Sequence, residues 1–532
     1  MIEKLVARSR SVNWNKAFSM LLTVVLLVSW MVMAPAPEAS PRAQPVLLGL
    51  ATESPEEIVG VIVQKLVRDT RVENMVARMG GVVTKDLYII NAFAVELPAK
   101  AVPELARAAG VRWVSLDAAV VSSGEPVKDA DRKLSPPNYY LDTLGVRRVW
   151  DMGLQGQGIT VVVIDSGIST DQDFSDTDNS FVRESSGSAT RLRIQLSFNP
   201  NSTIVDDVYG HGTWVAGIIG GNGADSRGAY AGIAPKVNLI SLKISDENGM
   251  AYESDTVDAM QWVLQNKDKY NIRVVNLSIN STVKQSYHTS PMDAAAEILW
   301  FNRIVVVASA GNKGPDGGYN TIDAAPANDP FIITVGASDE HGTADRSDDT
   351  VAPFSAYGRT MDGFLKPDIV APGRDIISVL AVTSSWDVEH PDRVVLDGEY
   401  FRLSGTSASA PMVAGAAALL LQDEPDLTPD QVKYRLMHTG SAMTIDCADA
   451  KDYLDVYLNV YTAVTGTTSE SANTGIEASQ LLWTGDDPVN WDSVNWDSVN
   501  WDSVNWDSVN WDSVNWDSVN WDSVSFSSVN WD

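Results

Sequence analysis

The sequence contains a single cysteine, Cys447, among 532 residues. A lone cysteine excludes an intramolecular disulfide and a cysteine-rich zinc site. It is also a poor nucleophile, because Asp446 and Asp449 flank it and nearby negative charge disfavours a thiolate. The folded chain must therefore be stabilised by packing or by bound ions.

Basic residues are scarce as well. The chain has 39 Lys and Arg against 69 Asp and Glu, a net charge of −30, and no basic residue follows Thr465. This balance excludes nucleic acid as a partner, since such proteins need a basic face to neutralise phosphates. The remaining composition, 44% hydrophobic and 20% charged, is that of a globular protein large enough for more than one domain.

The amino end carries a pattern that precedes the globular part. Basic residues lead into an uncharged apolar run from Ala17 to Ala34, and small residues and prolines follow. We expect residues 1–36 to be a signal peptide, which makes the protein secreted or attached at the cell surface, with only transient membrane contact. A retained membrane anchor is the alternative, because ~18 apolar residues are just enough to cross a bilayer.

Residues 57–121 have the pattern of a small open-faced sheet with two helices. Strand-like runs alternate with short amphipathic stretches. The expected strands are Ile58 to Gln64, Leu87 to Leu97 and Val111 to Leu116, and the expected helices are Val72 to Met79 and Ala99 to Ala109. Residues 117–137 are polar and rich in charge, which predicts an exposed connection that a protease could cut.

Residues 138–464 have a different pattern, in which apolar strands alternate with helical stretches. Near-continuous apolar runs are typical of parallel strands that are covered on both faces. The expected strands are Ile159 to Ile164, Val237 to Ile244, Val274 to Ile279, Ile304 to Ser309 and Phe331 to Val335; helices are expected at Asp255 to Tyr270 and Pro291 to Asn302. The prediction is a doubly wound α/β domain, whose sites form at the carboxyl ends of the strands.

The carboxyl-terminal stretch is of low complexity. Residues 465–488 are expected to be a linker, and residues 489–532 repeat the unit Val-Asn-Trp-Asp-Ser with a period of five. This period gives no single apolar face in a strand or in a helix. Two interpretations stay open: a solvated spacer, or a tail for wall binding, retention or self-association, in which the tryptophans could stack on the sugars of a wall or glycan.

Histidine is rare, and one of the five has an unusual context. His211 lies in Gly210-His211-Gly212-Thr213, just before an apolar helical stretch. Flanking glycines allow other segments to approach the ring, and histidine is the usual general base near neutral pH. Asp165 ends the apolar strand Val161 to Ile164, where a buried carboxylate could hold a histidine ring; capping a helix is the alternative role for it.

Two further segments could supply the remaining groups. Ser407, in Gly405-Thr406-Ser407, precedes the apolar stretch Met412 to Leu421, so it lies where a helix N-terminus favours a developing anion. A capping serine is the alternative. Asn312 follows the strand Ile304 to Ser309 in a Gly-Asn turn, and its amide either shapes the turn or donates to an oxyanion.

These four segments, in this order and within one α/β stretch, resemble the subtilisin-like serine proteases, or subtilases. That family is itself a standard example of the triad order Asp, His, Ser. The resemblance covers residues 138–464 and implies a three-layer α/β domain with a mainly parallel sheet. It implies that Ser407 is the nucleophile of a serine endopeptidase, His211 the general base, Asp165 the orienting carboxylate and Asn312 an oxyanion donor.

The resemblance also implies how the substrate and the leader bind. It assigns Asn276, Leu277, Ser278, Ile279 and Asn280 to a strand that pairs with extended polypeptide substrates, together with Ala310 and Gly311. Residues 57–121 resemble the family's ferredoxin-like α+β propeptide, an intramolecular inhibitor. Self-cleavage of the zymogen is then expected between Val121 and Asn138.

No cofactor is expected for the chemistry, but the resemblance makes structural calcium possible. Acidic side chains that could bind it cluster in one loop: Asp171, Asp173, Asp176 and Asp178. A solvated acidic loop is the alternative. The rival functions are a catalytically silent relative that binds through its tail, and an esterase or another serine hydrolase.

Overall fold

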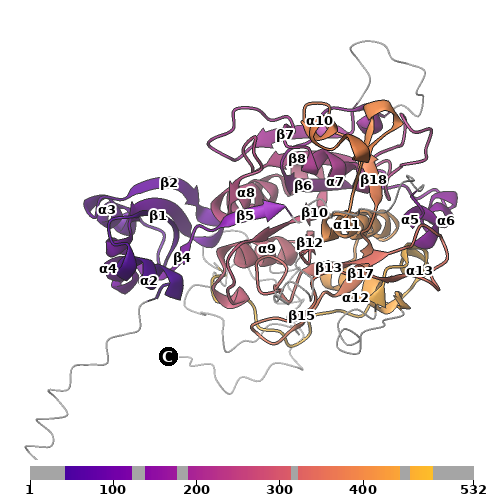
Figure 1. The fold of residues 1–532 in the computed structure, drawn as a ribbon. Helices are drawn as coiled ribbons and strands as arrows, with labels where there is room; N and C mark the ends of the chain where they lie inside the picture. Colours follow the sequence, from indigo (N-terminus) through magenta and orange to yellow (C-terminus); the bar gives the residue numbers. More distant parts are fainter. Residues whose placement is uncertain (1–41, 123–137, 177–189, 313–321, 444–455, 483–532) are drawn as a thin grey trace, which may run out of the picture. The chain divides into compact units, whose positions relative to one another are not determined.

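The computed structural model describes residues 42–122, 138–176, 190–312, 322–443 and 456–482 (Figure 1). The chain divides into two units, Met1–Arg42 and Ala43–Asp532, and the elements below belong to the second. The expected signal peptide, the repeats of residues 489–532 and most of the cleavable connection lie outside the described residues. No helix within the described ranges is long and apolar enough to cross a membrane.

The leader forms an antiparallel sheet of four strands in the order β2-β3-β1-β4. Its elements follow a βαββαβ order: β1 (Ile58–Lys65), α3 (Arg71–Arg78), β2 (Val82–Leu87), β3 (Ala92–Pro98), α4 (Val102–Arg107) and β4 (Val111–Leu116), after α2 (Pro45–Glu53). The strand expected from Leu87 to Leu97 is wrong in its first part. Asn91 adopts a left-handed φ of 49° and ends a single 3₁₀ turn, η1 (Tyr88–Ile90).

The two faces of the leader sheet have different neighbours. In β1, Val61 and Val63 pack into the leader's own core with its helices, whereas Ile62 belongs to the large core of the α/β domain. In β3 the small residues Ala92 and Ala94 face that large core. This alternation of period two allows the central strands β1 and β3 to be buried on both faces.

The α/β domain is built on a sheet in the order β21-β22-β17-β13-β12-β10-β6-β8-β7, with β14 beside β13. Its parallel members are β6 (Thr160–Asp165), β7 (Leu192–Ser197), β8 (Asn238–Lys243), β10 (Ile272–Leu277), β12 (Val305–Ser309), β13 (Ile333–Asp339), β17 (Ile369–Pro372) and β22 (Val456–Tyr457). Only β14 (Thr350–Val351) and β21 (Ser441–Ala442) pair antiparallel. All five strands expected from apolar runs are present, and β10 ends two residues earlier than expected.

Helices on both faces of this sheet complete a three-layer arrangement (Figure 1). α7 (His211–Gly220) packs against α11 (Thr406–Asp423), and α8 (Glu253–Tyr270) packs against α9 (Pro291–Phe301). Every residue of β6 and of β12 is buried, as expected of strands covered on both faces. The other helices are α5 (Tyr140–Thr143), α6 (Val146–Asp151), α10 (Trp386–Glu389), α12 (Pro429–His438) and α13 (Val460–Thr465).

Within the described ranges, three small sheets lie outside the main sheet and the leader sheet. One has the order β11-β5-β9, with β11 (Ile279–Ser281), β5 (Ala119–Ser122) and β9 (Ala251–Tyr252); the others are β15 (Gly358–Arg359) with β16 (Leu365–Lys366), and β18 (Ile376–Val379) with β20 (Tyr400–Leu403) and β19 (Val394–Val395). The first of them joins the end of the leader to the α/β domain.

The described part of the expected linker, residues 466–482, is packed against other elements. Asn473 donates to Asp430 at 2.6 Å, and the backbone N–H of Ser479 donates to Glu297 at 2.8 Å. Leu481 is buried, and its carbonyl oxygen accepts from Gln64 of the leader at 2.5 Å. This segment therefore contacts both the α/β domain and the leader.

Candidate active site

Asp165 and His211 come together at the carboxyl end of β6. His211 Nδ1 lies 2.7 Å from Asp165 Oδ1, and the side chains are 0% and 2% exposed, respectively. Asp165 Oδ1 also accepts from the backbone N–H of Ser166 at 2.7 Å. A carboxylate oxygen can only accept, so this contact uses a proton on Nδ1 and leaves Nε2 as the ring nitrogen that faces away from Asp165.

The glycines around His211 have a definite steric role. A Cβ atom on Gly212 would lie 2.1 Å from the carbonyl oxygen of Gly167 and 3.2 Å from Asp165 Cβ. Gly210, the N-cap of α7, has a left-handed φ of 106°. The segment that carries Asp165 and the helix that begins with His211 therefore meet more closely than any larger residue would allow.

Ser407 is the second residue of α11 and is fully buried. Its Oγ lies 3.5 Å from the carbonyl oxygen of Ser278. His211 Nε2 is buried and has no hydrogen-bond partner among the described residues. The hydroxyl of Ser407 thus points to Ser278 here and is not hydrogen-bonded to the histidine.

Asn312 is oriented by the residue that precedes Ser407. Its Oδ1 accepts from the backbone N–H of Thr406 at 2.9 Å and from the Thr406 hydroxyl at 3.0 Å. Because a backbone N–H can only donate, the atom that faces it must be the amide oxygen. The NH₂ group of Asn312 is therefore on the side away from Thr406, and the contact with Thr406 was not predicted from the sequence.

The segment from Asn276 to Asn280, which was expected to bind substrate, has a buried first part and a last part that forms a paired strand. Leu277 and Ser278 are buried, Asn276 donates to Ser278 Oγ at 3.0 Å, and Ser278 Oγ donates to the carbonyl oxygen of Ser407 at 3.2 Å. The paired edge begins at Ile279, since Ile279–Ser281 form β11. These contacts make Asn276 and Ser278 part of the support beneath Ser407.

Asn280, Ala310 and Gly311 lie together at one end of this edge. Asn280 donates to the carbonyl oxygen of Ser309 at 3.1 Å, and a Cβ on Gly311 would lie 3.5 Å from Asn280 Oδ1. Gly311 has a left-handed φ of 102°, and its N–H donates to the Thr406 hydroxyl at 3.0 Å. Ala310 is buried in a small separate core.

The leader's last described strand runs along the same edge. β5 pairs antiparallel with β11 on one side and with β9 on the other, with Ser122 opposite Ile279 and Val120 opposite Ala251. Side chains of Val120 and Ser122 line a pocket that Asp165 also lines. The second edge, β9, gave no recognisable signal in the sequence.

Residues 156–473 match the family model described as the subtilase family. The chain belongs to the subtilases. Serine protease AprX of Bacillus subtilis (strain 168) is 39% identical over 294 residues, which are 54% of this chain and 62% of AprX. Subtilisin NAT of Bacillus subtilis subsp. natto is 29% identical over 370 residues, which are 69% of this chain and 80% of that protein.

A solved structure supports the same fold. Fervidolysin from Fervidobacterium pennivorans, a keratinolytic enzyme related to subtilisin, matches with a TM-score of 0.59 at 22% identity, over 80% of this chain and 63% of fervidolysin. The chain thus spans less than two thirds of the length of AprX and of fervidolysin. The predicted α/β fold with a mainly parallel sheet is confirmed.

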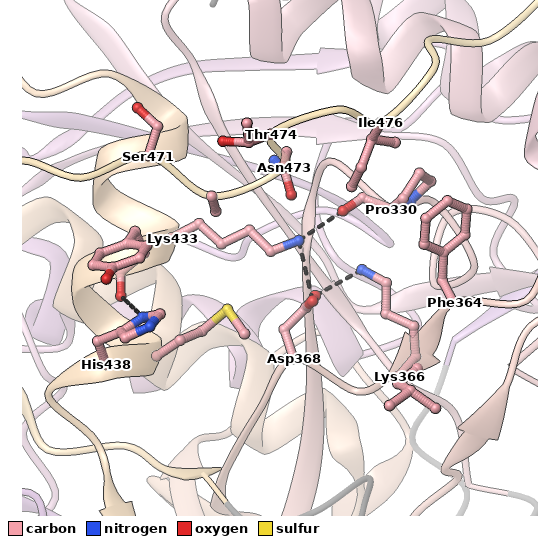
Figure 2. Close-up of a pocket in the computed structure, with 14 residues that line it drawn as sticks. Pro330, Phe364, Lys366, Asp368, Lys433, His438, Ser471, Asn473, Thr474 and Ile476 are labelled. Carbon is pink, nitrogen blue, oxygen red and sulfur yellow. Dashed lines mark hydrogen bonds and ion pairs between the residues drawn. The ribbon is translucent and has the colours of Figure 1, made fainter. Parts of the chain in front are cut away.

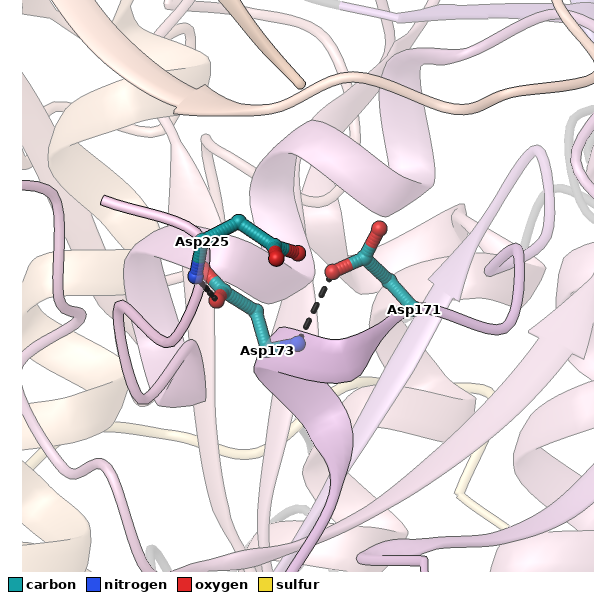
Figure 3. Close-up of side chains that lie close together, drawn as sticks. All are labelled: Asp171, Asp173 and Asp225. Carbon is teal, nitrogen blue, oxygen red and sulfur yellow. Dashed lines mark hydrogen bonds between the residues drawn. The ribbon is translucent and has the colours of Figure 1, made fainter. Parts of the chain in front are cut away.

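This subtilase has an acidic cluster near β6, shown in Figure 3. Asp171, Asp173 and Asp225 each place a carboxylate oxygen within 4.8 Å of the others. Burial raises the pKa of Asp171 to about 7 and that of Asp173 to about 6. Three carboxylates in one partly dehydrated place have the hard oxygen ligands that Ca²⁺ prefers.

The cluster differs from the set expected from the sequence. Asp176 lies 3.9 Å from Arg193 and is not in the cluster, and Asp178 lies outside the described residues. Asp225 was missed, because it follows Asp173 by 52 residues and only the fold brings the two together. The backbone N–H of Asp225 donates to Asp173 Oδ1 at 3.2 Å.

A second pocket, shown in Figure 2, contains none of the expected catalytic residues. Its floor holds two buried lysines around one carboxylate: Lys366 lies 2.6 Å and Lys433 3.1 Å from Asp368. Lys433 also donates to the carbonyl oxygens of Pro330, Phe331 and Ile332. Burial lowers the pKa of Lys366 to about 8. These ammonium groups bind internal acceptors and anchor the segment that leads into β17.

Proposed function

We propose that this subtilase is a secreted serine endopeptidase, made as a zymogen that processes itself. The observation that carries the proposal is the buried contact of 2.7 Å between His211 Nδ1 and Asp165 Oδ1, at the start of a helix that packs against the helix of Ser407. A carboxylate that orients a neutral imidazole is what a general base requires. The relatives named above support the class of reaction.

The reaction is acyl transfer from a peptide to Ser407 and then to water. The Ser407 hydroxyl turns from Ser278 toward His211 Nε2, gives its proton to that nitrogen and attacks the peptide carbonyl carbon. Asp165 stabilises the imidazolium, while the Asn312 NH₂ and the Ser407 N–H donate to the tetrahedral oxyanion. His211 then protonates the leaving amine, and water hydrolyses the acyl-enzyme by the same steps.

The leader acts as the intramolecular inhibitor. Strand β5 takes the antiparallel place between β11 and β9 that an extended substrate would take, with Val120 buried and Val121 45% exposed. Asp117 accepts from the backbone N–H of Ser254 at 2.9 Å at the start of α8. Because β5 ends at Ser122, we place the self-cleaved bond between Ser122 and Asn138.

The proposals for where the protein is located and for what its carboxyl-terminal repeats do rest on the sequence alone. The basic and apolar pattern of residues 1–36 supports secretion through a signal peptide. For the repeats of residues 489–532, a spacer and a contact to the wall or a glycan stay as alternative hypotheses. Deleting these repeats and measuring cell association separates the two.

Covalent labelling tests the activity. A serine-directed phosphonylating reagent should modify Ser407 alone in the mature protein and stop hydrolysis of casein. No labelling of wild type would favour the catalytically silent relative. Faster hydrolysis of simple esters than of polypeptide, relative to known endopeptidases, would favour an esterase.

We propose that Asp171, Asp173 and Asp225 bind one structural Ca²⁺, which takes no part in the chemistry. Without an ion, carboxyls with raised pKa values favour the folded state at low pH and lose this contribution as the pH rises toward 7. Adding calcium should therefore raise the unfolding temperature by about 5–10 °C near neutral pH and by less in acid, since protons compete for the ligands. Calorimetry with calcium or with a chelator, at several pH values, measures this effect.

Two substitutions provide the control. Asp225→Asn should lose most of the response to calcium, whereas Asp176→Asn, outside the cluster, should keep it. An equal response in both variants would contradict the assignment of the site.

A further inference from the structure

A second buried carboxylate lies four residues before His211 and has no part in the mechanism above. Asp207 is completely buried, and each of its oxygens accepts two hydrogen bonds. Oδ1 accepts from Ser166 Oγ at 2.8 Å and from the Gly210 N–H at 2.7 Å. Oδ2 accepts from the Thr213 N–H at 2.8 Å and from Thr213 Oγ1 at 2.7 Å.

One of these bonds supplies an acceptor for an N–H group in the first turn of α7. The first N–H groups of a helix have no partner within the helix, and a glycine N-cap has no side chain to bind them. Gly210 is that cap, so Asp207 supplies the missing acceptor for the N–H of Thr213. The amino end of the helix that begins with His211 is therefore fixed by Asp207.

The same hydrogen-bond network extends to Asp165, the partner of His211. Ser166 Oγ donates to Asp207 and accepts from the Gly212 N–H at 2.8 Å, while the Ser166 N–H donates to Asp165 Oδ1 at 2.7 Å. The residues on both sides of His211 are thus joined, through Asp207 and Ser166, to the backbone that carries Asp165.

We propose that Asp207 is a positioning residue for catalysis, which holds His211 at the distance and angle from Asp165 and Ser407 that proton transfer requires. The inference rests on the proposed function and adds a residue to it. Each oxygen of Asp207 accepts from one backbone N–H, so an amide at this position directs its NH₂ group at a group that can only donate, and loses the acceptor for it. A displacement of the ring by about 1 Å is enough to cost about 10²-fold in rate.

The test measures turnover for each active site. Full-length Asp207→Asn is matured with a trace of wild-type enzyme, and its active sites are counted with the phosphonylating reagent. We expect kcat for each titrated site to fall by up to about 10²-fold with little change in KM, because the substrate edge at β11 and β9 is untouched. Ser166→Ala, which leaves Asp207 in place and breaks the link to Asp165, should give a smaller fall in kcat of the same kind.

Asp430→Asn is the matched control. Asp430 is also a buried aspartate, and its Oδ1 accepts from Trp300 Nε1 at 3.0 Å and from Asn473 Nδ2 at 2.6 Å. This variant removes a buried carboxylate, can keep both bonds through its amide oxygen, and should leave kcat for each titrated site unchanged. If Asp207 were merely structural, Asp207→Asn and Ser166→Ala would behave in the same way as this control, and that result would overturn the inference.

The outcomes separate this inference from the proposed function. A wild-type protein that is neither labelled nor active means that the proposed function is wrong. An active wild type with unchanged turnover in both variants rejects only the role of Asp207. Should Asp207→Asn not fold, Ser166→Ala alone decides, since it removes one hydroxyl from the network.

Discussion

The Ser407→Ala variant should lose hydrolysis of casein by about 10⁶-fold in kcat, the order found for the corresponding change in subtilisin itself. It should also keep its leader, so that mass analysis finds a chain that still contains residues 57–121. The physical reason is that in the proposed mechanism the same hydroxyl attacks substrate and leader alike, and β5 of the leader pairs with β11 and β9. A trimmed wild type beside an untrimmed variant is the expected result.

A mixing experiment completes this test. Adding mature wild-type enzyme to Ser407→Ala should cut the variant between Ser122 and Asn138, because the connection is intact and only the nucleophile is missing. If Ser407→Ala purified alone were trimmed like wild type, another protease would carry out maturation and self-processing would be refuted. Residual activity near the wild-type level would refute the role of Ser407.

The central strands could be predicted because burial on both faces leaves a strong apolar signal. β6 and β12 are such strands, and their residues are apolar almost without interruption. β7 was not predicted, because it lies at the sheet edge and alternates Leu, Arg, Ile and Gln with only partial burial. The turn at Tyr88–Ile90 was missed since its buried isoleucines have the same apolar character as a strand.

The residues of the candidate site differ in the same way: some have a local sequence pattern, and others are linked only to residues far along the chain. Asp165, His211 and Ser407 could be selected as candidates because each has a local signature at the end of a strand or the start of a helix. Asp225 and Thr406 are hydrogen-bonded to partners far along the chain, Asp173 and Asn312, so no local pattern indicates them. The packing of residues 466–482 was also not predicted, because some of its contacts use backbone atoms, such as the Leu481 carbonyl oxygen and the Ser479 N–H, which any residue type supplies.

Asn312→Ala should lower kcat by about 10²–10³-fold with little change in KM, the range known for loss of one oxyanion donor in a subtilisin. In the proposed mechanism the amide donates to an oxygen that becomes fully charged only in the tetrahedral transition state, so its loss should affect turnover more than binding. Asn312→Asp should be at least as damaging, because it keeps the acceptor that Thr406 requires and replaces the donor by negative charge. Steady-state kinetics on a chromogenic peptide measures both variants.

The Thr406→Val variant tests how much the orientation of the Asn312 amide matters, because it leaves the amide in place and removes one of the two bonds that orient it. Without the hydroxyl, Asn312 Oδ1 keeps the bond of 2.9 Å from the Thr406 N–H and loses the bond of 3.0 Å, so the loss in kcat should be smaller than in Asn312→Ala. In the double variant Thr406→Val, Asn312→Ala, the threonine change should add little, since it acts through the missing amide. If the losses in kcat from the two single variants multiplied in the double variant, Thr406 would influence Ser407 directly. An unchanged kcat in Asn312→Ala would remove Asn312 from the oxyanion site.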